Sequence, residues 1–162
     1  MKILCFLTAL GFGGAGAAAA EQPLAPMDFW AGHCFTGAFA DGKQTDEHCF
    51  TWVFEGSVLR DHHVARNPGK PDYVGETVYF WDPDADKIAY LYYENEGGIS
   101  RGTVEPVADG LVLPATQYKA PGQSMTYRAR WTKQGNKAYE AFSEAQNGDK
   151  WVTMFKMVLR RD

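Results

Sequence analysis

Ten short segments of alternating apolar and polar residues constrain this chain more than any other feature. Clusters of Gly, Pro, Asn and Asp separate them at intervals of about eight to twelve residues. A period of two is typical of strands with one buried face, and no stretch after residue 20 has the apolar spacing of a long helix. The predicted strands span residues 33–39, 46–54, 57–65, 73–81, 87–96, 99–107, 110–118, 124–132, 137–146 and 150–161.

Because the connections are short, consecutive strands are expected to pair antiparallel. A meander of about ten strands must protect its two edges, and closure into a barrel removes them. We therefore predict an all-β, up-and-down barrel preceded by a short helical turn within residues 25–32. A two-sheet sandwich is the alternative, but it needs longer cross-connections than these turns provide.

Residues 1–20 have the pattern of a secretory signal peptide. Lys2 precedes the apolar run at 3–12, and small residues at 13–20 predict cleavage after Ala20. The apolar run is too short to span a bilayer. We therefore expect an exported protein, periplasmic or secreted, without membrane insertion, in which residues 21–162 form a single domain.

The composition excludes some partners. With 20 acidic against 16 basic residues, the chain lacks the positive charge that nucleic acids and anionic membrane surfaces favour. It also lacks a nucleophile elbow, a Gly-rich phosphate loop and a His-x-x-x-His zinc motif. We therefore assign no catalytic residue, metal or cofactor from the sequence.

The stretch "HCFTGAFADGKQTDEHCF" at 33–50 predicts a hairpin around Asp41-Gly42, in which Cys34 faces Cys49. Two opposed cysteines in an exported protein are expected to form a disulfide; free thiols are the alternative. Direct cross-strand disulfides favour a non-hydrogen-bonded pair, whose Cα atoms lie about 4.5 Å apart. A strict two-residue turn gives the other pair type, so we expect a four-residue loop over 40–43, or a bulge.

Alternation along this hairpin places His33 and His48 on one face as diagonal neighbours. The same face carries aromatic residues, including Phe50, Trp52 and Phe54, and is predicted to point inward. The two histidines then line a ligand cavity or form half of a metal site; alternatively, they lie at the rim and bond to water or backbone. A zinc site that also uses both cysteines is disfavoured, because adjacent strand residues point to opposite faces.

The strand at 57–65 does not reveal its inward face. Arg60 and His62 share one face, which would suit an anionic or carbonyl ligand if it lay inside the barrel. A solvated outer face is the alternative. Among the later aromatic residues, Tyr79 and Tyr127 are candidates for hydroxyls that line a cavity, although filling the core is the default role of such rings.

The segment "FWAGHCFTG" at 29–37, with "GETVYFWDPDADKIAYLYY" at 75–93 and "DGLV" at 109–112, resembles the lipocalin-like barrels of the calycin group. More narrowly, it resembles small exported bacterial proteins of unknown function. Cys34 stands where those barrels usually carry a Trp. No histidine follows His63, so the late haem-ligating histidine of the related nitrobindins has no counterpart. The resemblance implies a barrel with a cavity for a small, largely apolar molecule.

Three functions are compatible with these observations. The first is a binding protein that holds a small hydrophobic molecule in the barrel. The second is a cofactor-free isomerase or cyclase that uses His33, His48, His62 or Arg60 as acid–base groups. The third is a non-catalytic interaction module of the cell envelope that has no cavity.

Overall fold

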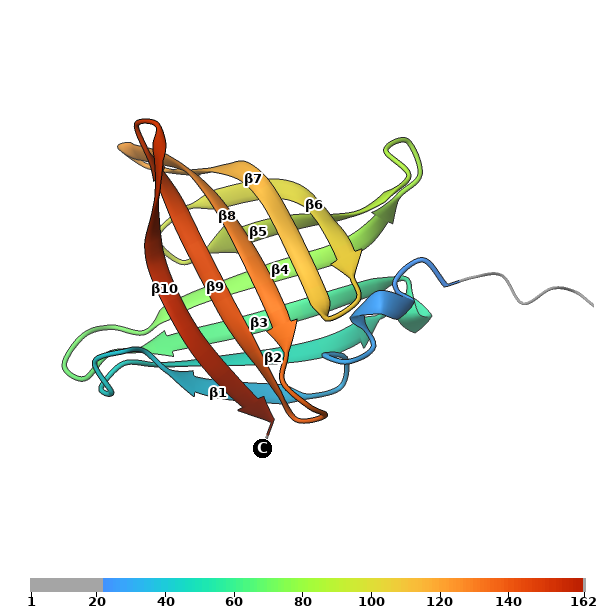
Figure 1. Ribbon diagram of the computed structural model, residues 1–162, viewed down its shortest axis with the longest axis horizontal. Helices are drawn as coiled ribbons and strands as arrows, with labels where there is room; N and C mark the ends of the chain where they lie inside the picture. The colour runs from blue at the N-terminus through green and yellow to red at the C-terminus, as the bar shows by residue number, and fades with distance from the viewer. Residues whose placement is uncertain (1–21, 162) are drawn as a thin grey trace, which may run out of the picture.

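The computed structural model describes residues 22–161, which form a closed barrel of ten strands (Figure 1). The predicted up-and-down barrel is confirmed, and every predicted strand agrees within two residues at each end. No helix of the described residues is long and apolar enough to cross a membrane. The predicted signal peptide lies outside this range. The strands are β1 (Cys34–Ala38), β2 (Thr45–Val53), β3 (Val58–Arg66), β4 (Tyr73–Asp82), β5 (Lys87–Glu94), β6 (Ile99–Val107), β7 (Gly110–Ala120), β8 (Gln123–Lys133), β9 (Ala138–Asn147) and β10 (Lys150–Arg161).

Each strand pairs antiparallel with the next, and β1 closes the barrel by pairing with β10 as well. This last seam is short, because Phe35 faces Arg161 and Thr36 faces Arg160. Gly37 lies beside it, and a Cβ at this position would come within 2.9 Å of the Val158 carbonyl oxygen. Glycine therefore allows β1 to approach β10, and the short pairing between them closes the sheet.

The N-terminal segment closes one end of the barrel. The predicted helical turn is present as the 3-10 turn η1 (Ala25–Met27), at the right of Figure 1. Three residues after this turn, Trp30 is fully buried. Its ring packs against Trp131 at a centroid distance of 5.6 Å and against Tyr139 at 5.8 Å. These rings belong to the main apolar core, which therefore lies at the η1 end of the barrel.

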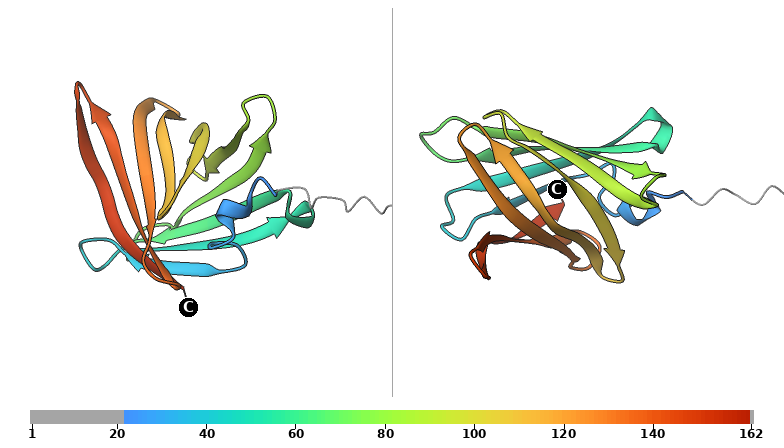
Figure 2. Two further views of the ribbon diagram at one scale, coloured as in Figure 1. Left: turned by 45° about the vertical axis from the view of Figure 1, so that its right-hand side comes forward. Right: turned by 90° about the horizontal axis from the view of Figure 1, so that it is seen from above.

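The turns β1–β2, β3–β4, β5–β6, β7–β8 and β9–β10 lie at the opposite end, at the left of Figure 1. Both views in Figure 2 show the strands wrapped around one interior, with η1 held against one end. The two ends thus differ: one is filled by the N-terminal segment and the other carries only hairpin turns.

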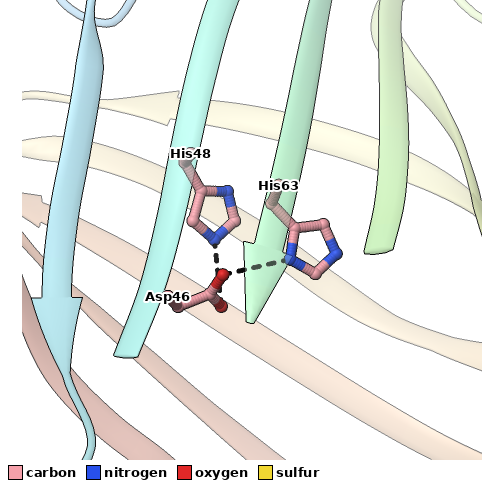
Figure 3. Close-up of side chains that lie close together, drawn as sticks. All are labelled: Asp46, His48 and His63. Carbon is pink, nitrogen blue, oxygen red and sulfur yellow. Dashed lines mark hydrogen bonds and ion pairs between the residues drawn. The ribbon is translucent and has the colours of Figure 1, made fainter. Parts of the chain in front are cut away.

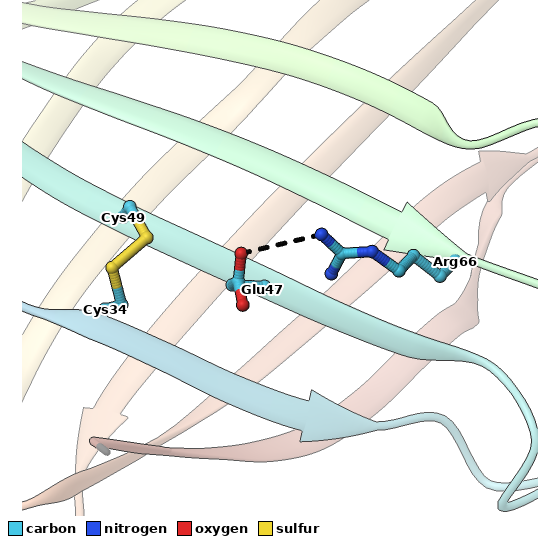
Figure 4. Close-up of a disulfide and its surroundings, with 4 residues drawn as sticks. All are labelled: Cys34, Glu47, Cys49 and Arg66. Atoms are coloured by element: carbon cyan, nitrogen blue, oxygen red, sulfur yellow. Dashed lines mark ion pairs between the residues drawn. A yellow bond between two sulfur atoms is a disulfide. The ribbon is translucent and has the colours of Figure 1, made fainter.

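The first hairpin has the predicted disulfide between Cys34 and Cys49 (Figure 4). The hydrogen bonds from Phe50 N–H to the His33 carbonyl and from Phe39 N–H to the Gln44 carbonyl make the cysteines a non-hydrogen-bonded pair, with Cα atoms 4.0 Å apart. The expected four-residue loop over 40–43 is therefore confirmed. The disulfide lies on the outer face of the sheet, as do Glu47 and Arg66, an ion pair at 3.7 Å.

The β1–β2 loop is stabilised by its own side chain. Asp41 Oδ1 accepts backbone hydrogen bonds from Lys43 at 2.9 Å and Gln44 at 3.0 Å. These two N–H groups lower the pKa of the exposed Asp41 carboxyl. Gly42 has φ +66°, a conformation that glycine adopts without strain.

The β2–β3 turn corrects one detail of the sequence analysis. Alternation placed Phe54 on the inner face with Phe50 and Trp52, but Phe54 is 78% exposed. The strand ends at Val53, and Phe54 begins the turn η2 (Phe54–Gly56) with φ +51°. Once the backbone leaves the extended conformation, alternation no longer determines where a side chain points.

Replacing both Cys34 and Cys49 with serine is expected to lower the free energy of unfolding by about 2–4 kcal/mol. The disulfide joins residues 15 positions apart, and the loop that it closes reduces the entropy of the unfolded chain by an amount worth about 3 kcal/mol. Urea denaturation of the oxidised protein and the double variant measures the difference. Wild-type protein treated with a reductant is the matched control and should unfold like the variant. Equal midpoints for all three samples would contradict the prediction.

Candidate functional site

A cavity of about 430 Å³ lies inside the barrel, between the N-terminal segment with η1, which closes one end, and the hairpin turns at the other end. Most of its wall is aromatic or otherwise apolar. Trp131, Tyr139 and Leu159 line its deeper part, and Phe39, Met154 and Phe155 line the part nearer the turns. One section of the wall, on β2 and β3, is polar instead: Asp46, His48, Asp61 and His63.

Three of the predicted site residues line this cavity: His48, Tyr79 and Tyr127. Phe50 points inward but is packed in the core, where its ring lies 5.9 Å from that of Trp131. Trp52 is partly buried against the same core. His33 lies outside the cavity, edge-on to Phe35 at 6.4 Å, so the structure does not bring it to His48.

The other two predicted residues lie on the outer face of β3. Arg60 is exposed, and His62 faces Glu76, with Nδ1 3.5 Å from Oε1. The sequence left the inward face of this strand open, and the structure assigns it to the buried Leu59, Asp61 and His63. Arg60 and His62 therefore do not line the cavity, which corrects their proposed placement.

The polar wall is built from the same pattern on two neighbouring strands. β2 carries Asp46 and His48 two residues apart, and β3 carries Asp61 and His63 with the same spacing. The β2–β3 register places His48 directly opposite His63, so the two imidazole rings stack with centroids 4.9 Å apart and an interplanar angle of 12°. The two aspartates flank this pair along opposite diagonals.

Each histidine is held from two sides. His48 Nδ1–H donates to Asp61 Oδ2 at 2.8 Å, and its Nε2 lies 3.4 Å from Asp46 Oδ2. His63 Nδ1 lies 3.2 Å from Asp46 Oδ1, so Asp46 bridges the two rings (Figure 3). The other nitrogen of His63 lies 3.3 Å from the hydroxyl of Tyr92, which in turn is 2.7 Å from that of Tyr73.

These contacts determine the charges of the wall. Burial alone would lower the pKa of His48, but Asp61 and Asp46 outweigh it and raise the pKa to about 10. Burial alone would raise the pKa of Asp46, but hydrogen bonds from His48 and His63 hold it well below its ordinary value of 3.8. At neutral pH the wall thus contains the His48 imidazolium beside the Asp46 carboxylate.

Two polar atoms of the cavity wall have no hydrogen-bond partner among the described residues. They are Asp61 Oδ1 and the hydroxyl oxygen of Tyr139, in side chains that are 1% and 0% exposed. An unsatisfied buried polar group costs about 1–3 kcal/mol, so such groups usually meet water or a ligand. Both residues line the cavity, so one acceptor and one hydroxyl without partners lie in its wall.

A second cluster of polar side chains lies across the cavity, and its members form hydrogen bonds with one another. The hydroxyls of Tyr90 and Tyr127 are 3.0 Å apart, and Tyr127 donates to Ser100 Oγ at 3.0 Å. The Ser100 hydroxyl in turn donates a hydrogen bond to the Gln117 carbonyl at 3.0 Å. Among the described residues that line the cavity, the buried side-chain atoms without a partner are Asp61 Oδ1 on β3 and the Tyr139 hydroxyl on β9.

The sequence analysis missed Asp46, Asp61, His63 and Tyr92. A signal for the first three was present, because "DEH" and "DHH" both place an Asp two residues before a His. In a strand this spacing puts both side chains on one face. No comparable signal pointed to Tyr92, whose contact with His63 crosses from β3 to β5.

No protein-family model matches the chain, and no curated protein is similar enough to count as a relative. The assignment of the site therefore rests on its geometry.

Replacing Tyr139 with phenylalanine is expected to leave the free energy of unfolding unchanged or to raise it by up to about 1 kcal/mol, because the lost hydroxyl is buried without a partner. Tyr127→Phe is the matched control. It should cost about 1–2 kcal/mol, since this hydroxyl bonds to Tyr90 and Ser100. Urea denaturation measures both, and a larger loss for Tyr139→Phe than for Tyr127→Phe would contradict the prediction.

Burial raises the pKa of Tyr79 and Tyr139 well above the ordinary 10.0. An unfolded tyrosine ionises near pH 10, whereas these two stay protonated in the fold. Their contribution to the free energy of unfolding is therefore fully present below pH 10 and is lost above it. Each should reduce the free energy of unfolding by about 1.4 kcal/mol per pH unit above pH 10. Denaturation at several pH values from 9 to 11.5 should show a shallower decline for Tyr139→Phe than for wild type; identical slopes would contradict this.

Proposed function

We propose that this chain is an exported protein that binds a small, largely hydrophobic molecule in the barrel cavity. The observation that carries the proposal is the cavity itself: the ten strands enclose more space than their side chains fill. Its volume of about 430 Å³ falls within the 300–1,000 Å³ typical of ligand pockets. The Cys34–Cys49 disulfide supports an oxidising, extracytoplasmic location.

The wall also indicates how such a molecule would lie. Its apolar body would pack against the rings and methionines that make up most of the lining, among them Trp131, Tyr90, Met125 and Met157. Its polar end would lie near Asp61 on β3 and Tyr139 on β9, whose Oδ1 and hydroxyl have no hydrogen-bond partner among the described residues. A ligand with one hydroxyl or carbonyl group would satisfy these atoms, so we infer an amphiphile rather than a pure hydrocarbon.

The likeness to lipocalin-like barrels supports the same function and remains part of the proposal. Lipocalins close with eight strands, whereas this barrel has ten. The shared property is a closed antiparallel barrel around a cavity, which different families use for different ligands.

A second candidate, a cofactor-free enzyme, is favoured by the His48–Asp61 pair, since a carboxylate that orients a histidine is common in acid–base catalysis. The residues would be His48 and His63 rather than His33, His62 or Arg60. With a pKa of about 10, His48 would serve as a proton donor at neutral pH rather than as a base. An interaction module without a cavity is the least supported of the three.

Titration with N-phenyl-1-naphthylamine, a small fluorescent hydrophobe, is expected to show one saturable site with micromolar affinity. Replacing Ala129, which lines the cavity, with phenylalanine should weaken binding at least tenfold by filling the space. The control is Ala138→Phe on the outer face of β9, next to the inward Tyr139. Thermal melts establish that both variants fold.

Native mass spectrometry of the protein purified from its own host, without reduction, identifies the natural ligand by its extra mass. Absence of probe binding by the wild type would contradict the proposal, as would equal binding by both variants.

A further inference from the structure

We propose that Asp46, His48 and His63 bind a divalent first-row transition-metal ion, with zinc as the best fit, in the polar wall of the cavity. This site goes beyond the binding of a hydrophobic molecule and does not depend on it. From the sequence, His33 and His48 are a candidate half of a metal site, and no metal ion is assigned. The structure instead groups His48 with a second inward histidine and a carboxylate.

The separations between the three side chains match a common metal centre. One ligand atom from each residue lies within 4.8 Å of the others. His48 Nε2 is 3.4 Å from Asp46 Oδ2, and His63 Nδ1 is 3.2 Å from Asp46 Oδ1. Ligand atoms about 2.1 Å from one zinc ion and at the tetrahedral angle lie about 3.4 Å apart. Small shifts of these three side chains would therefore allow an ion to replace the protons in the hydrogen bonds that now link them.

The orientation of both rings is fixed by outer contacts. Asp61 Oδ2 binds Nδ1 of His48 at 2.8 Å, which leaves Nε2 facing Asp46. The Tyr92 hydroxyl lies 3.3 Å from Nε2 of His63, which leaves Nδ1 facing Asp46. Metal-binding histidines almost always use their second nitrogen in this way, and a carboxylate is a frequent partner.

Gly75 makes one of these contacts possible. It faces His63 across the β3–β4 pair, and a Cβ at this position would overlap His63 Nε2. The same Cβ would lie 2.8 Å from Tyr92 Cε2. The absence of a side chain on Gly75 therefore gives His63 and Tyr92 the room in which they meet.

Charge also favours a cation at this place. Asp46 and Asp61 are 8% and 1% exposed, and Asp61 Oδ1 has no partner among the described residues. Buried carboxylates are stable only when they are paired or coordinate a metal. The negative charge of these two carboxyl groups, held in a place with little access to water, attracts a dication.

Two imidazoles and one carboxylate form a donor set suited to zinc or iron(II) rather than to calcium or magnesium, which prefer oxygen ligands. Three protein ligands also leave at least one coordination position free. Because Asp46, His48 and His63 all line the cavity, that position faces the enclosed space. The ion would thus be accessible to an oxygen-bearing group of a cavity ligand.

The test uses the oxidised protein, without a histidine tag and treated with a chelator. Calorimetric titration with Zn²⁺ should show one equivalent bound with micromolar or tighter affinity, and Co²⁺ should produce the visible absorption of a low-coordinate cobalt ion. His48→Gln, His63→Gln and Asp46→Asn should each weaken Zn²⁺ binding at least 100-fold. The matched control is His62→Gln, on the same strand as His63 but on the outer face, which should stay within threefold of wild type.

Tyr92→Phe keeps all three ligands and removes only the outer hydrogen bond, so it should weaken Zn²⁺ binding about 10- to 100-fold. This variant and the wild-type cobalt spectrum keep the proposal testable even if a ligand variant does not fold. No zinc binding by the wild type, or equal binding by folded ligand variants, would overturn the proposal. Loss of binding in His62→Gln would do so as well, because it would place the ion on the surface.

Naphthylamine binding by the metal-free protein separates this proposal from the preceding one. If the probe binds and zinc does not, the cavity function stands and the metal site is overturned. If zinc binds with the predicted variant pattern and the probe does not bind, the metal site stands by itself.

Discussion

The pairing of β1 with both β2 and β10 is the constraint on which the rest of this structure depends. A ten-stranded sheet that closes on itself surrounds more volume than its own inward side chains fill. The chain fills one end with the segment that precedes β1, where Trp30 packs on Trp131 and Tyr139. The remaining volume is the cavity, so closure of the sheet and the existence of a candidate site have the same cause.

The register of β2 against β3 has a comparable role at the level of the site. It places His48 opposite His63 and brings Asp46 and Asp61 to the two sides of the pair. A shift of β2 by one residue would turn Asp46 and His48 to the outer face and break up the group, because side chains alternate along a strand. The same alternation moves Arg60 and His62 out of the cavity. One pairing thus decides both the members of the polar wall and the residues that it excludes.

The cavity combines two environments that favour different occupants. Most of its surface is aromatic or aliphatic and suits a hydrophobic body, whereas the wall on β2 and β3 concentrates charge in a place with little access to water. Buried charges need partners, and these side chains satisfy one another only in part, since Asp61 Oδ1 is left without a partner. The proposed amphiphile would offer a partner to this oxygen, the proposed metal ion would bring positive charge to the wall, and the two can bind together.

The sequence by itself determined the strand segments, the antiparallel order, the first hairpin and its disulfide, because these follow from local alternation, turn residues and short separations. Alternation also predicted His48 as an inward residue. Only the tertiary structure decided which face of β3 points inward, since both faces of that strand carry histidine and charge. It alone decided that His33 lies apart and that Tyr92 meets His63, because such contacts depend on how distant strands are placed around the barrel.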